Sequence, residues 1–383
     1  MTTTINAVNV HVITAPLSEP FGFSQGWVTN RNSVLVEILS NDGHSGWGES
    51  LCHGLQKPEI AASIIQNVYA PKVKGRNVSD IEVIWEELYN LTRPFGQGGA
   101  VVNALSGVDI ALWDLWGKIL GQPVSRLIGG RFRERVRPYV TAFYRRKGGL
   151  YPQEGIVEAE KHIQDGFDYL KLKVGFGIEE DVSFIKAVRE AFPGVNLMVD
   201  ANCAYAVPTA RKILERIVDY DLHFFEEPLA PEDLEGYRLL RSLGLVSIAA
   251  GENLLGKHAC ARWISGGVLD YLQPDICSSG GFTELKKISA LCQAWNTTMI
   301  PHVWGSGVCL AATLQLIASL PPTPLSLKPI EPILEYDRSD HPFRSDLIFG
   351  ALGRDADGMI PILDKPGLGI EINREVLNRF SVS

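Results

Sequence analysis

The sequence predicts an α/β fold: a (β/α)8-type barrel, or modified TIM barrel, preceded by an N-terminal α+β capping domain. From about residue 136, short β-rich runs alternate with amphipathic helices. Parallel strands need a crossover connection, so repeated βα units predict a parallel sheet. Seven clear strands and a candidate eighth fit a closed barrel better than an open sheet. No G-x-G-x-x-G motif follows a strand, so the main sign of a dinucleotide-binding fold is missing.

The barrel elements follow from alternation in the runs and helical periodicity between them. The expected strands are 136–144, 169–174, 195–200, 222–226, 246–250, 271–276, 298–303 and, as the candidate eighth, 326–335. The helices between them include 178–192, 208–219, 233–243, 254–265, 281–295 and 306–320.

The first 130 residues read as strands followed by helices. Ile5–Pro16 alternates apolar and polar residues, and Ser33–Gly48 contains two strands joined by the turn Asn41-Asp42-Gly43. Residues 19–30 are rich in Gly, Phe and Ser and are expected to form a loop that is too apolar to be fully solvated. Ala100–Gly121 has a broad apolar face and ends at a glycine that predicts a helix stop.

These patterns divide the chain into three parts. We expect a capping domain over 1–130, a barrel over 131–345 and a C-terminal segment over 346–383. The segment contains a strand-like run, Gly367–Asn373, which is expected to pack back on the capping domain.

Composition narrows the classes of partner. Of 383 residues, 45% are apolar and 21% are charged, which is typical of a globular enzyme. The net charge of −8 argues against binding to a phosphate backbone. No apolar run approaches the roughly 20 residues of a membrane span, and Met1–Ala15 lacks the pattern of a signal peptide. Six cysteines without a C-x-x-C pair predict reduced thiols and a cytoplasmic protein. The negative charge and the lack of a long apolar run predict that it has neither nucleic-acid nor membrane partners.

Polar residues stand at the ends of successive predicted strands. They are Lys171 and Lys173, Asp200 and Asn202, Glu226 and Glu227, Glu252 and Asn253, Asp275, and His302. Their leading members are between 23 and 29 residues apart, about the length of one βα unit. The residues are therefore expected at the carboxyl-terminal face of the barrel, where TIM-barrel enzymes carry their active sites.

Three consecutive strand ends carry Asp200, Glu226 and Glu252. Three carboxylates placed side by side repel one another without a cation, and carboxylate oxygens select a hard ion, most simply Mg²⁺, with Mn²⁺ as an alternative. Asn202 is expected to orient a ligand or contact the substrate. Period-two alternation puts one glutamate of the next pair inward; we expect Glu226 there, with Glu227 facing the helices or pairing with a neighbouring strand. The competing interpretation is that these acids cap helices and anchor loops.

The other end residues suggest two acid/base groups. Lys171 and Lys173 flank Leu172, so alternation sends both lysines into the barrel mouth, where mutual repulsion and a nearby cation are expected to lower their pKa. Asp275 can hold one nitrogen of His302 and leave the other for substrate. An ordinary surface pair of lysines and a satisfied buried histidine are the alternatives. Together the groups predict removal of a proton α to a carboxylate and stabilisation of the enediolate by the metal.

At these residues the sequence resembles the enolase superfamily, mandelate racemase subgroup. The matching stretches are Lys171-Leu172-Lys173, Asp200-Ala201-Asn202, Glu226-Glu227-Pro228, Gly251-Glu252-Asn253, Gln273-Pro274-Asp275 and Pro301-His302-Val303-Trp304. The resemblance covers nearly the whole chain and implies a capping domain whose loops close over the barrel.

The resemblance also implies roles. Asp200, Glu226 and Glu252 would bind Mg²⁺. Lys173 would be one acid/base group, and His302, paired with Asp275, the other, while Lys171 would contact the substrate carboxylate. Glu335 matches the glutamate of the eighth strand that hydrogen-bonds the enediolate, with Glu331 as a competitor.

Within the subgroup, three stretches look most like the galactarolactone cycloisomerase family: Gly280–Glu284, Pro301–Gly305, and Pro329–Arg338 with Pro342–Arg344 after it. That family opens a sugar-acid lactone by removing the α-proton and expelling the ring oxygen from the β-carbon. Candidate substrate contacts are Phe21, Phe23, Trp27 and His53 from the cap, and Tyr144, Arg145 and Arg146 from the end of the first barrel strand. An arginine there would take a distal carboxylate, with surface solubility as the alternative.

The first hypothesis is therefore a Mg²⁺-dependent cycloisomerase of an aldaric-acid lactone. The second is a dehydratase of an acid sugar or hydroxy acid, and the third is a racemase or epimerase. A non-catalytic carbohydrate-binding barrel is the alternative from outside enzymology. The expected partners are a small sugar acid or its lactone and, as in this family, further copies of the same chain.

Overall fold

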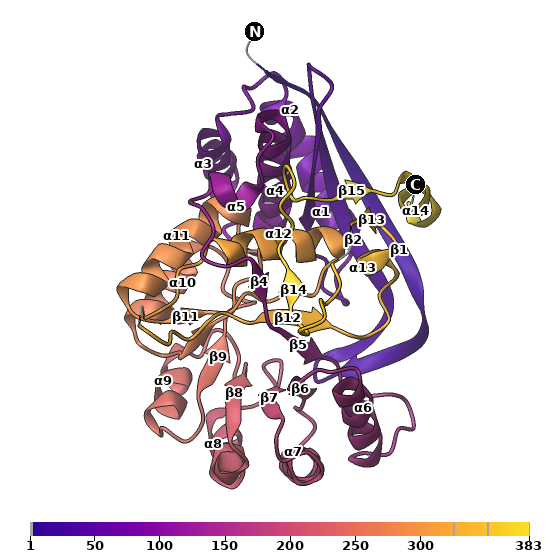
Figure 1. The fold of residues 1–383 in the computed structure, drawn as a ribbon. Coiled ribbons are helices and arrows are strands. Elements are labelled where there is room, and N and C mark those ends of the chain that lie inside the picture. The colour runs from indigo at the N-terminus through magenta and orange to yellow at the C-terminus, as the bar shows by residue number, and fades with distance from the viewer. Residues whose placement is uncertain (1–2, 325, 351, 383) are drawn as a thin grey trace.

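The computed structural model describes residues 3–324, 326–350 and 352–382. The capping domain opens with a three-stranded antiparallel sheet of β1 (Ile5–Phe23), β2 (Gly26–Ser40) and β3 (Ser45–Ser50). Figure 1 shows β1 and β2 running along one side of the molecule, from the cap down to the level of the barrel. The turn at Asn41-Asp42-Gly43 joins β2 to β3 as predicted.

Residues 19–30 form the end of a long hairpin, so the prediction of a loop there was wrong. The β1–β2 ladder continues through Phe21 paired with Val28 to Phe23 paired with Gly26. The apolar side chains that made a solvated loop improbable are the reason: Phe21, Phe23 and Val28 are buried together against barrel residues. The hairpin tip, Ser24-Gln25, thereby reaches the barrel face.

Helices cover this sheet. They are α1 (Pro58–Ile64), the π-helix η1 (Ile65–Tyr69), α2 (Ala70–Val73), α3 (Ile81–Thr92), α4 (Gly99–Leu120) and α5 (Val124–Leu127). The predicted helix Ala100–Gly121 is confirmed as α4, which ends at Gly121 in the left-handed conformation with a φ of 64°. A Cβ at Gly46 of β3 would lie 2.2 Å from the Ala111 carbonyl oxygen, so only glycine lets α4 pack this close to the sheet.

The barrel is an eight-stranded parallel sheet in the order β11-β10-β9-β8-β7-β6-β5-β12. Its strands are β5 (Pro138–Thr141), β6 (Tyr169–Lys173), β7 (Asn196–Asp200), β8 (Leu222–Glu226), β9 (Ile248–Ala250), β10 (Tyr271–Leu272), β11 (Thr298–Met299) and β12 (Leu334–Asp337). The connections carry α6 (Gln153–Gln164), α7 (Ile178–Ala191), α8 (Val207–Ile217) with the 3-10 helix η2 (Val218–Tyr220), α9 (Leu234–Ser242), α10 (Lys257–Ser265), α11 (Gly281–Ala294) and α12 (Gly307–Ala318). The predicted barrel fold is thus confirmed.

The eighth strand is shorter than predicted. It begins at Leu334, where pairing with β5 starts, instead of at residue 326. Residues 326–333 contain two prolines, Pro329 and Pro332, and proline cannot donate a hydrogen bond to a strand ladder. The first predicted run, 136–144, contains β5 and the end of β4 (Arg135–Val136), which pairs with β14 outside the barrel.

The floor of the barrel is apolar and closed. Tyr139, Met198, Phe224, Ala249 and Ile300 pack together inside it and are fully buried. This plug leaves polar residues room only toward the carboxyl ends of the strands, and it excludes water from below.

The C-terminal segment returns to the cap. It follows α13 (Pro342–Ser345) and consists of β13 (Ile348–Phe349), β14 (Ile360–Pro361), β15 (Glu371–Ile372) and α14 (Arg374–Phe380). The Leu368 amide donates to Asp114 of α4 at 2.7 Å, and the Val382 amide donates to the Val12 carbonyl at 2.9 Å. None of the described helices has the length and apolarity needed to cross a bilayer.

Two buried carboxylates of the cap join it to the barrel. Glu49 of β3 accepts from the Ser306 and Cys309 amides, both at 2.9 Å, at the start of α12. Asp109 of α4 accepts from the Thr283 amide at 3.1 Å and from its hydroxyl at 2.5 Å, at the start of α11. The first amides of a helix lack partners within the helix and attract negative charge. The cap is therefore seated on the helices that follow β10 and β11.

We predict that Asp109→Ala lowers the free energy of unfolding by about 1–3 kcal/mol, because it leaves the buried Thr283 amide and hydroxyl without an acceptor. The midpoint of urea unfolding measures the change. Asp219→Ala is the control, since that exposed carboxylate has no comparable partner and should shift stability by less than about 0.5 kcal/mol. Equal shifts for the two variants would contradict the role assigned to Asp109.

Candidate active site

The sheet register brings the predicted residues to one level. Lys173 pairs with Asp200, and Asp200 pairs with Glu226, in consecutive ladders of β6, β7 and β8. Glu252 follows the end of β9 by two residues. Because parallel strands in register end together, these side chains meet at the carboxyl-terminal rim of the barrel.

Both lysines of β6 point inward and pair with acids. The Lys171 ammonium lies 2.8 Å from Glu226 Oε2 and 2.6 Å from Glu335 Oε1. The Lys173 ammonium donates to Asp200 Oδ2 at 2.5 Å and to Asn202 Oδ1 at 2.9 Å. Alternation along the strand therefore gave the correct direction for both side chains.

The expectation of a lowered lysine pKa was wrong for these contacts. Burial alone would lower the pKa of Lys173, but the adjacent carboxylate of Asp200 outweighs it and raises the pKa above the ordinary value. Burial is likewise outweighed at Lys171, whose pKa is raised by Glu226 and Glu335. At Lys173 the attraction of Asp200 outweighs the repulsion by the Lys171 ammonium, and both lysines are held charged by the carboxylates that contact them.

His302 lies between two carboxylates. Its Nδ1 is 2.7 Å from Asp275 Oδ2, and its Nε2 is 3.1 Å from Glu252 Oε2. Burial would lower the pKa of the imidazole, yet Glu252 and Glu335 raise it well above the ordinary value. Asp275 itself is held in place by the Cys277 amide at 2.6 Å. The imidazole is thus oriented from one side and faces the acid cluster with the other.

Glu335 completes the ring from β12. It accepts from the Thr141 hydroxyl at 2.5 Å and from the Val303 amide at 2.8 Å. Burial opposes ionisation, but Lys171 and His302 lower the pKa of Glu335 to about 2. The competitor Glu331 is half-exposed on the outside of the barrel and pairs with Arg133, so it takes no part in the site.

The triad Asp200, Glu226 and Glu252 suits a hard divalent cation in its donor chemistry. All three offer carboxylate oxygens, and Glu226 Oε1 is buried without a hydrogen-bond partner in the protein. Burial and the charge of Asp200 raise the pKa of Glu226 to about 7, and a cation beside it would reverse that cost. The oxygens of the triad are more widely spread than in a closed metal site. Among the described residues, one group of three ligand-type side chains has donor atoms within 4.8 Å of one another, and it is Asp275, Cys277 and Cys309, not the triad. The Glu252 carboxylate lies against His302.

Glu227 occupies a place that alternation did not predict. Asn253 Nδ2 donates to its two oxygens at 2.9 and 3.1 Å, in keeping with the expected contact to a neighbouring strand end. The side chain also lines the same pocket as Glu252 instead of turning to the helices. The reason is a φ of 41° at Glu227, which breaks the strand geometry just past β8.

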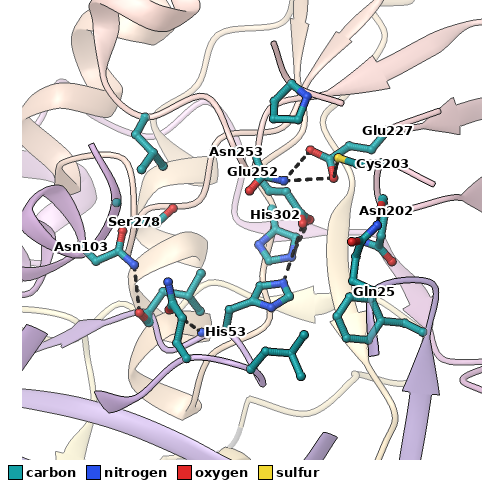
Figure 2. Close-up of a pocket in the computed structure, with 17 residues that line it drawn as sticks. Gln25, His53, Asn103, Asn202, Cys203, Glu227, Glu252, Asn253, Ser278 and His302 are labelled. Atoms are coloured by element: carbon teal, nitrogen blue, oxygen red, sulfur yellow. Dashed lines mark hydrogen bonds and ion pairs between the residues drawn. The ribbon is translucent and has the colours of Figure 1, made fainter. Parts of the chain in front are cut away.

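A pocket of about 340 Å³ opens above this rim, between the barrel and the cap (Figure 2). Asn202, Glu252 and His302 line it from the barrel, and Phe23 and His53 line it from the cap. A larger cavity of about 800 Å³ lies beside α6 and the Tyr144–Tyr151 loop and contains none of the strand-end acids or bases. The chemistry therefore belongs to the smaller pocket.

Two of the four candidate cap contacts line this pocket, and two do not. Phe23 and His53 reach the pocket, and His53 Nε2 lies 3.9 Å from Glu252 Oε1. Trp27 is 42% exposed and packs beside Lys147 outside the pocket, so its prediction as a substrate contact was wrong. Phe21 is buried under Arg31, 5.0 Å from its guanidinium.

The residues after the first barrel strand separate by alternation. Tyr144 points toward the site, where its hydroxyl accepts from Trp304 Nε1 at 2.9 Å and its ring lies 5.4 Å from the Lys173 ammonium. Arg145 points the other way, stacks 3.8 Å from the Tyr151 ring and pairs with Glu180 at 2.8 Å. Arg146 lies at the larger cavity. The prediction that Arg145 binds substrate is thus contradicted.

Several pocket residues were missed from sequence: Gln25, Gln56, Asn103, Cys203 and Ser278. Gln25 sits at the hairpin tip and donates to the Asn202 carbonyl at 2.7 Å. Recognition of the 19–30 hairpin would have pointed to Gln25. The others carry no local pattern that marks them, because their place depends on how the cap is seated.

Comparisons with known families agree with this architecture. Residues 5–129 match the family described as "Mandelate racemase / muconate lactonizing enzyme, N-terminal domain". Residues 156–376 match the family described as "Enolase C-terminal domain-like".

Individual relatives cover nearly the full chain. The chain is 41% identical to a D-galactarolactone cycloisomerase from Agrobacterium fabrum over 98% of both chains. It is 30% identical to an arabinonate dehydratase from Saccharolobus solfataricus, covering 91% of this chain and 90% of that one.

Solved structures show the same fold. The 3,6-anhydro-D-galactonate cycloisomerase from Zobellia galactanivorans matches with a TM-score of 0.88 and 32% identity, over 99% of this chain and 100% of that chain. A racemase from Streptomyces coelicolor, solved with bound magnesium, matches with a TM-score of 0.86 and 27% identity, over 99% of this chain and 100% of that chain. Since both halves match and the relatives are named as enzymes, the chain is an enzyme that belongs to the enolase superfamily, in its mandelate racemase subgroup.

Proposed function

We propose that this enzyme removes the proton α to the carboxylate of a sugar acid and then eliminates the β-oxygen, with a sugar-acid lactone of the galactarolactone type as its substrate. The observation that carries the proposal is the convergence of two acid/base side chains, Lys173 and His302, on one set of carboxylates from different strands. The relative at 41% identity, a galactarolactone cycloisomerase, supports the choice of substrate.

Asp200, Glu226 and Glu252 would hold Mg²⁺, with Mn²⁺ as a substitute. A bound divalent ion would supply positive charge that holds the substrate carboxylate, offsets the charge that develops as the α-proton leaves, and competes with the lysines for their acids. The orphaned Glu226 Oε1 supports this assignment.

The side chains of this protein have separable tasks. Lys171, fixed between Glu226 and Glu335, presents an ammonium to the substrate carboxylate. Lys173 or His302, once it has lost its proton, takes the α-proton, and the electron pair of that C–H bond moves toward the carboxylate. Asp275 holds the His302 ring in position through Nδ1.

The second half of the reaction separates two candidate activities. In a lactone the ring C–O bond breaks and the oxygen leaves the β-carbon as part of a new carboxylate. In a dehydratase a hydroxyl leaves and must be protonated, which His302 is positioned to do. The arabinonate dehydratase at 30% identity favours dehydration as the second candidate. Racemisation ranks third, because acid/base groups on two strands permit it.

Three further proposals accompany the activity. The capping domain is proposed to end at residue 130, and the barrel at residue 345. A cytoplasmic setting is supported by the six cysteines, which are all free in the part of the chain that the structure describes. Homo-oligomerisation is proposed from the family resemblance alone.

Incubation with Mg²⁺ and a panel of sugar acids and their lactones in D₂O tests the activity. Opening of the ring with formation of a new carboxylate identifies a cycloisomerase, and loss of water from an open-chain acid identifies a dehydratase. Deuterium at the α-carbon with every C–O bond intact identifies a racemase. A complete absence of α-deuteration across the panel would contradict the proposal.

We predict that Lys173→Ala and His302→Ala each lower kcat by about a hundred- to ten-thousand-fold, because each removes a group that moves a proton in the reaction. Steady-state kinetics on the substrate found in the panel measure the loss. Lys212→Ala and His44→Asn, both on the exposed surface, serve as controls and should keep activity within about twofold. Full activity in both active-site variants would refute the assignment of these bases.

We predict that EDTA abolishes turnover and that Mg²⁺ or Mn²⁺ restores it. Glu226→Gln should raise the Mg²⁺ concentration for half-maximal activity at least about tenfold, since a carboxylate ligand is lost. Glu331→Gln, which removes an acid on the outside of the barrel, should leave that concentration unchanged. Undiminished turnover in metal-free buffer would rule out the metal site.

A further inference from the structure

Two buried arginines from distant parts of the chain share one carboxylate. Arg31 of β2 pairs with Asp337, the last residue of β12, with its Nη2 3.0 Å from Oδ2. Arg344 of α13 approaches the same oxygen, with its Nη2 at 3.5 Å. The Arg31 side chain is 1% exposed and that of Arg344 is 11% exposed. Figure 1 shows α13 beside the long hairpin of β1 and β2. The junction of cap and barrel therefore brings two cations together, and the described lining of the catalytic pocket includes neither.

The carboxylate balances only one of the two cations. Among the described residues, Asp337 is the one acid in ion-pair contact with either arginine. Arg31 Nε donates to the main-chain carbonyl of Asp340 at 3.0 Å, while the Asp340 side chain is exposed. Burial and the two arginines hold the pKa of His341 well below its ordinary value, so this ring is neutral. Burial lowers the pKa of Arg31 as well, and the charge of Arg344 adds to that effect while Asp337 opposes it. The cluster therefore carries an excess of one buried positive charge.

Three guanidinium nitrogens in this cluster lack an acceptor. Arg31 Nη1 and both Nε and Nη1 of Arg344 are buried and have no hydrogen-bond partner among the described residues. Arg344 Nη2 is the exception, since it donates to the Gly305 carbonyl at 2.8 Å. The rings of Phe21 and Trp304 attract the Arg31 cation, at 5.0 and 4.1 Å, but offer its N–H groups no lone pair. Unused donors and unbalanced charge thus occur at the same place.

These two deficits together point to an anion. Orphaned buried polar groups in folded proteins mark a bound water or ion, and a buried charge without a partner is strongly destabilising. A water molecule would accept from the N–H groups but would leave the positive charge unbalanced. The described linings of the cavities of about 340 and 800 Å³ include neither arginine, so a site between them suits an anion of atomic size and not a sugar acid.

The cluster also has a route to solvent. Phe21, Ser339 and Asp340 contact Arg31 and at the same time line the larger cavity beside α6. A small ion that enters this cavity is therefore separated from the guanidinium by one layer of residues.

We propose that Arg31 and Arg344 form a binding site for a small inorganic anion, a halide such as chloride, at the junction of the capping domain and the barrel. The unused guanidinium N–H groups donate to the anion, and its charge offsets the excess. Because Arg344 holds Gly305 and Arg31 packs on Trp304, the anion stabilises the hairpin on the segment that follows His302. The site is independent of the proposed reaction.

Thermal unfolding tests the site in solution. Chloride is exchanged for the bulkier methanesulfonate at a constant ionic strength of about 0.1 M, with Mg²⁺ supplied as the methanesulfonate salt. An anion that binds only the folded state stabilises it in a saturable way, so we expect the unfolding midpoint to rise with chloride to a plateau at least about 2 °C higher. A midpoint that does not change with chloride would overturn the proposal.

A matched pair of arginine variants locates the effect. Arg344→Met removes the excess charge and two of the three unused nitrogens while keeping a long side chain, and we expect it to abolish the rise. Arg338→Met removes a more exposed cation of the same segment, which pairs with Asp165 at 3.1 Å, and should keep the full rise. Equal responses of the two variants to chloride would overturn the assignment to Arg344.

Crystals of the unmodified enzyme grown in bromide provide a test that needs no variant. We expect an anomalous scattering peak between the guanidinium groups of Arg31 and Arg344. Density there without an anomalous signal would identify an ordered water and overturn the proposal. A peak in the crystal together with an unfolding midpoint that ignores chloride would show binding at crystal concentration only, and would overturn it as well.

Discussion

The balance of buried charge at the barrel rim is the constraint on which the rest of this structure depends. Six acids gather there: Asp200, Glu226, Glu227, Glu252, Asp275 and Glu335. Among the residues that the structure describes, the cations that face these acids are Lys171, Lys173 and His302. A buried charge without a partner is strongly destabilising. Lys171 and His302 each lie beside several of these acids, and Lys173 pairs with Asp200. Burial and then the neighbouring carboxylates raise the pKa of Glu226 and of Glu227. The excess of acids is the physical reason that the rim suits a divalent cation.

The fold supports this cluster from both sides. Below it, the apolar plug around Tyr139 and Phe224 fills the barrel interior, so the polar side chains lie at the carboxyl ends of the strands. Above it, the cap is anchored by Glu49 and Asp109, which occupy the amide-rich starts of two barrel helices. One of these helices follows the strand that leads to His302. The same contacts that hold the domains together therefore also place the cap residues over the reacting groups.

The two domains divide the work. The barrel carries the groups that we propose to move protons and to bind the ion, and their positions follow from the register of neighbouring strands. The cap contributes amide and apolar side chains to the pocket, together with His53, which lies 3.9 Å from Glu252.

Much of this could be predicted from the sequence. The spacing of one βα unit between strand ends located the acids, the lysines and His302. This works because every βα unit of a barrel ends its strand at the same face. Alternation oriented Lys171 and Lys173 correctly. The prediction for Arg145 did not follow this alternation: because Tyr144 points toward the site, the next side chain, Arg145, points away from it. At Glu227 it failed because the backbone turns to a positive φ immediately after the strand.

Other features were decided only by the tertiary structure. The raised pKa of the lysines depends on which carboxylate lies closest. The local sequence of one strand does not give its distance to side chains on other strands. The β1–β2 hairpin extends through residues 19–30 because barrel residues bury its apolar tip. Asn103 and Ser278 enter the pocket through the seating of one domain on the other. The sequence by itself determined the barrel and its row of charged strand ends, since these follow from local periodicity; the pairing of those charges and the lining of the pocket arose only when distant segments packed together.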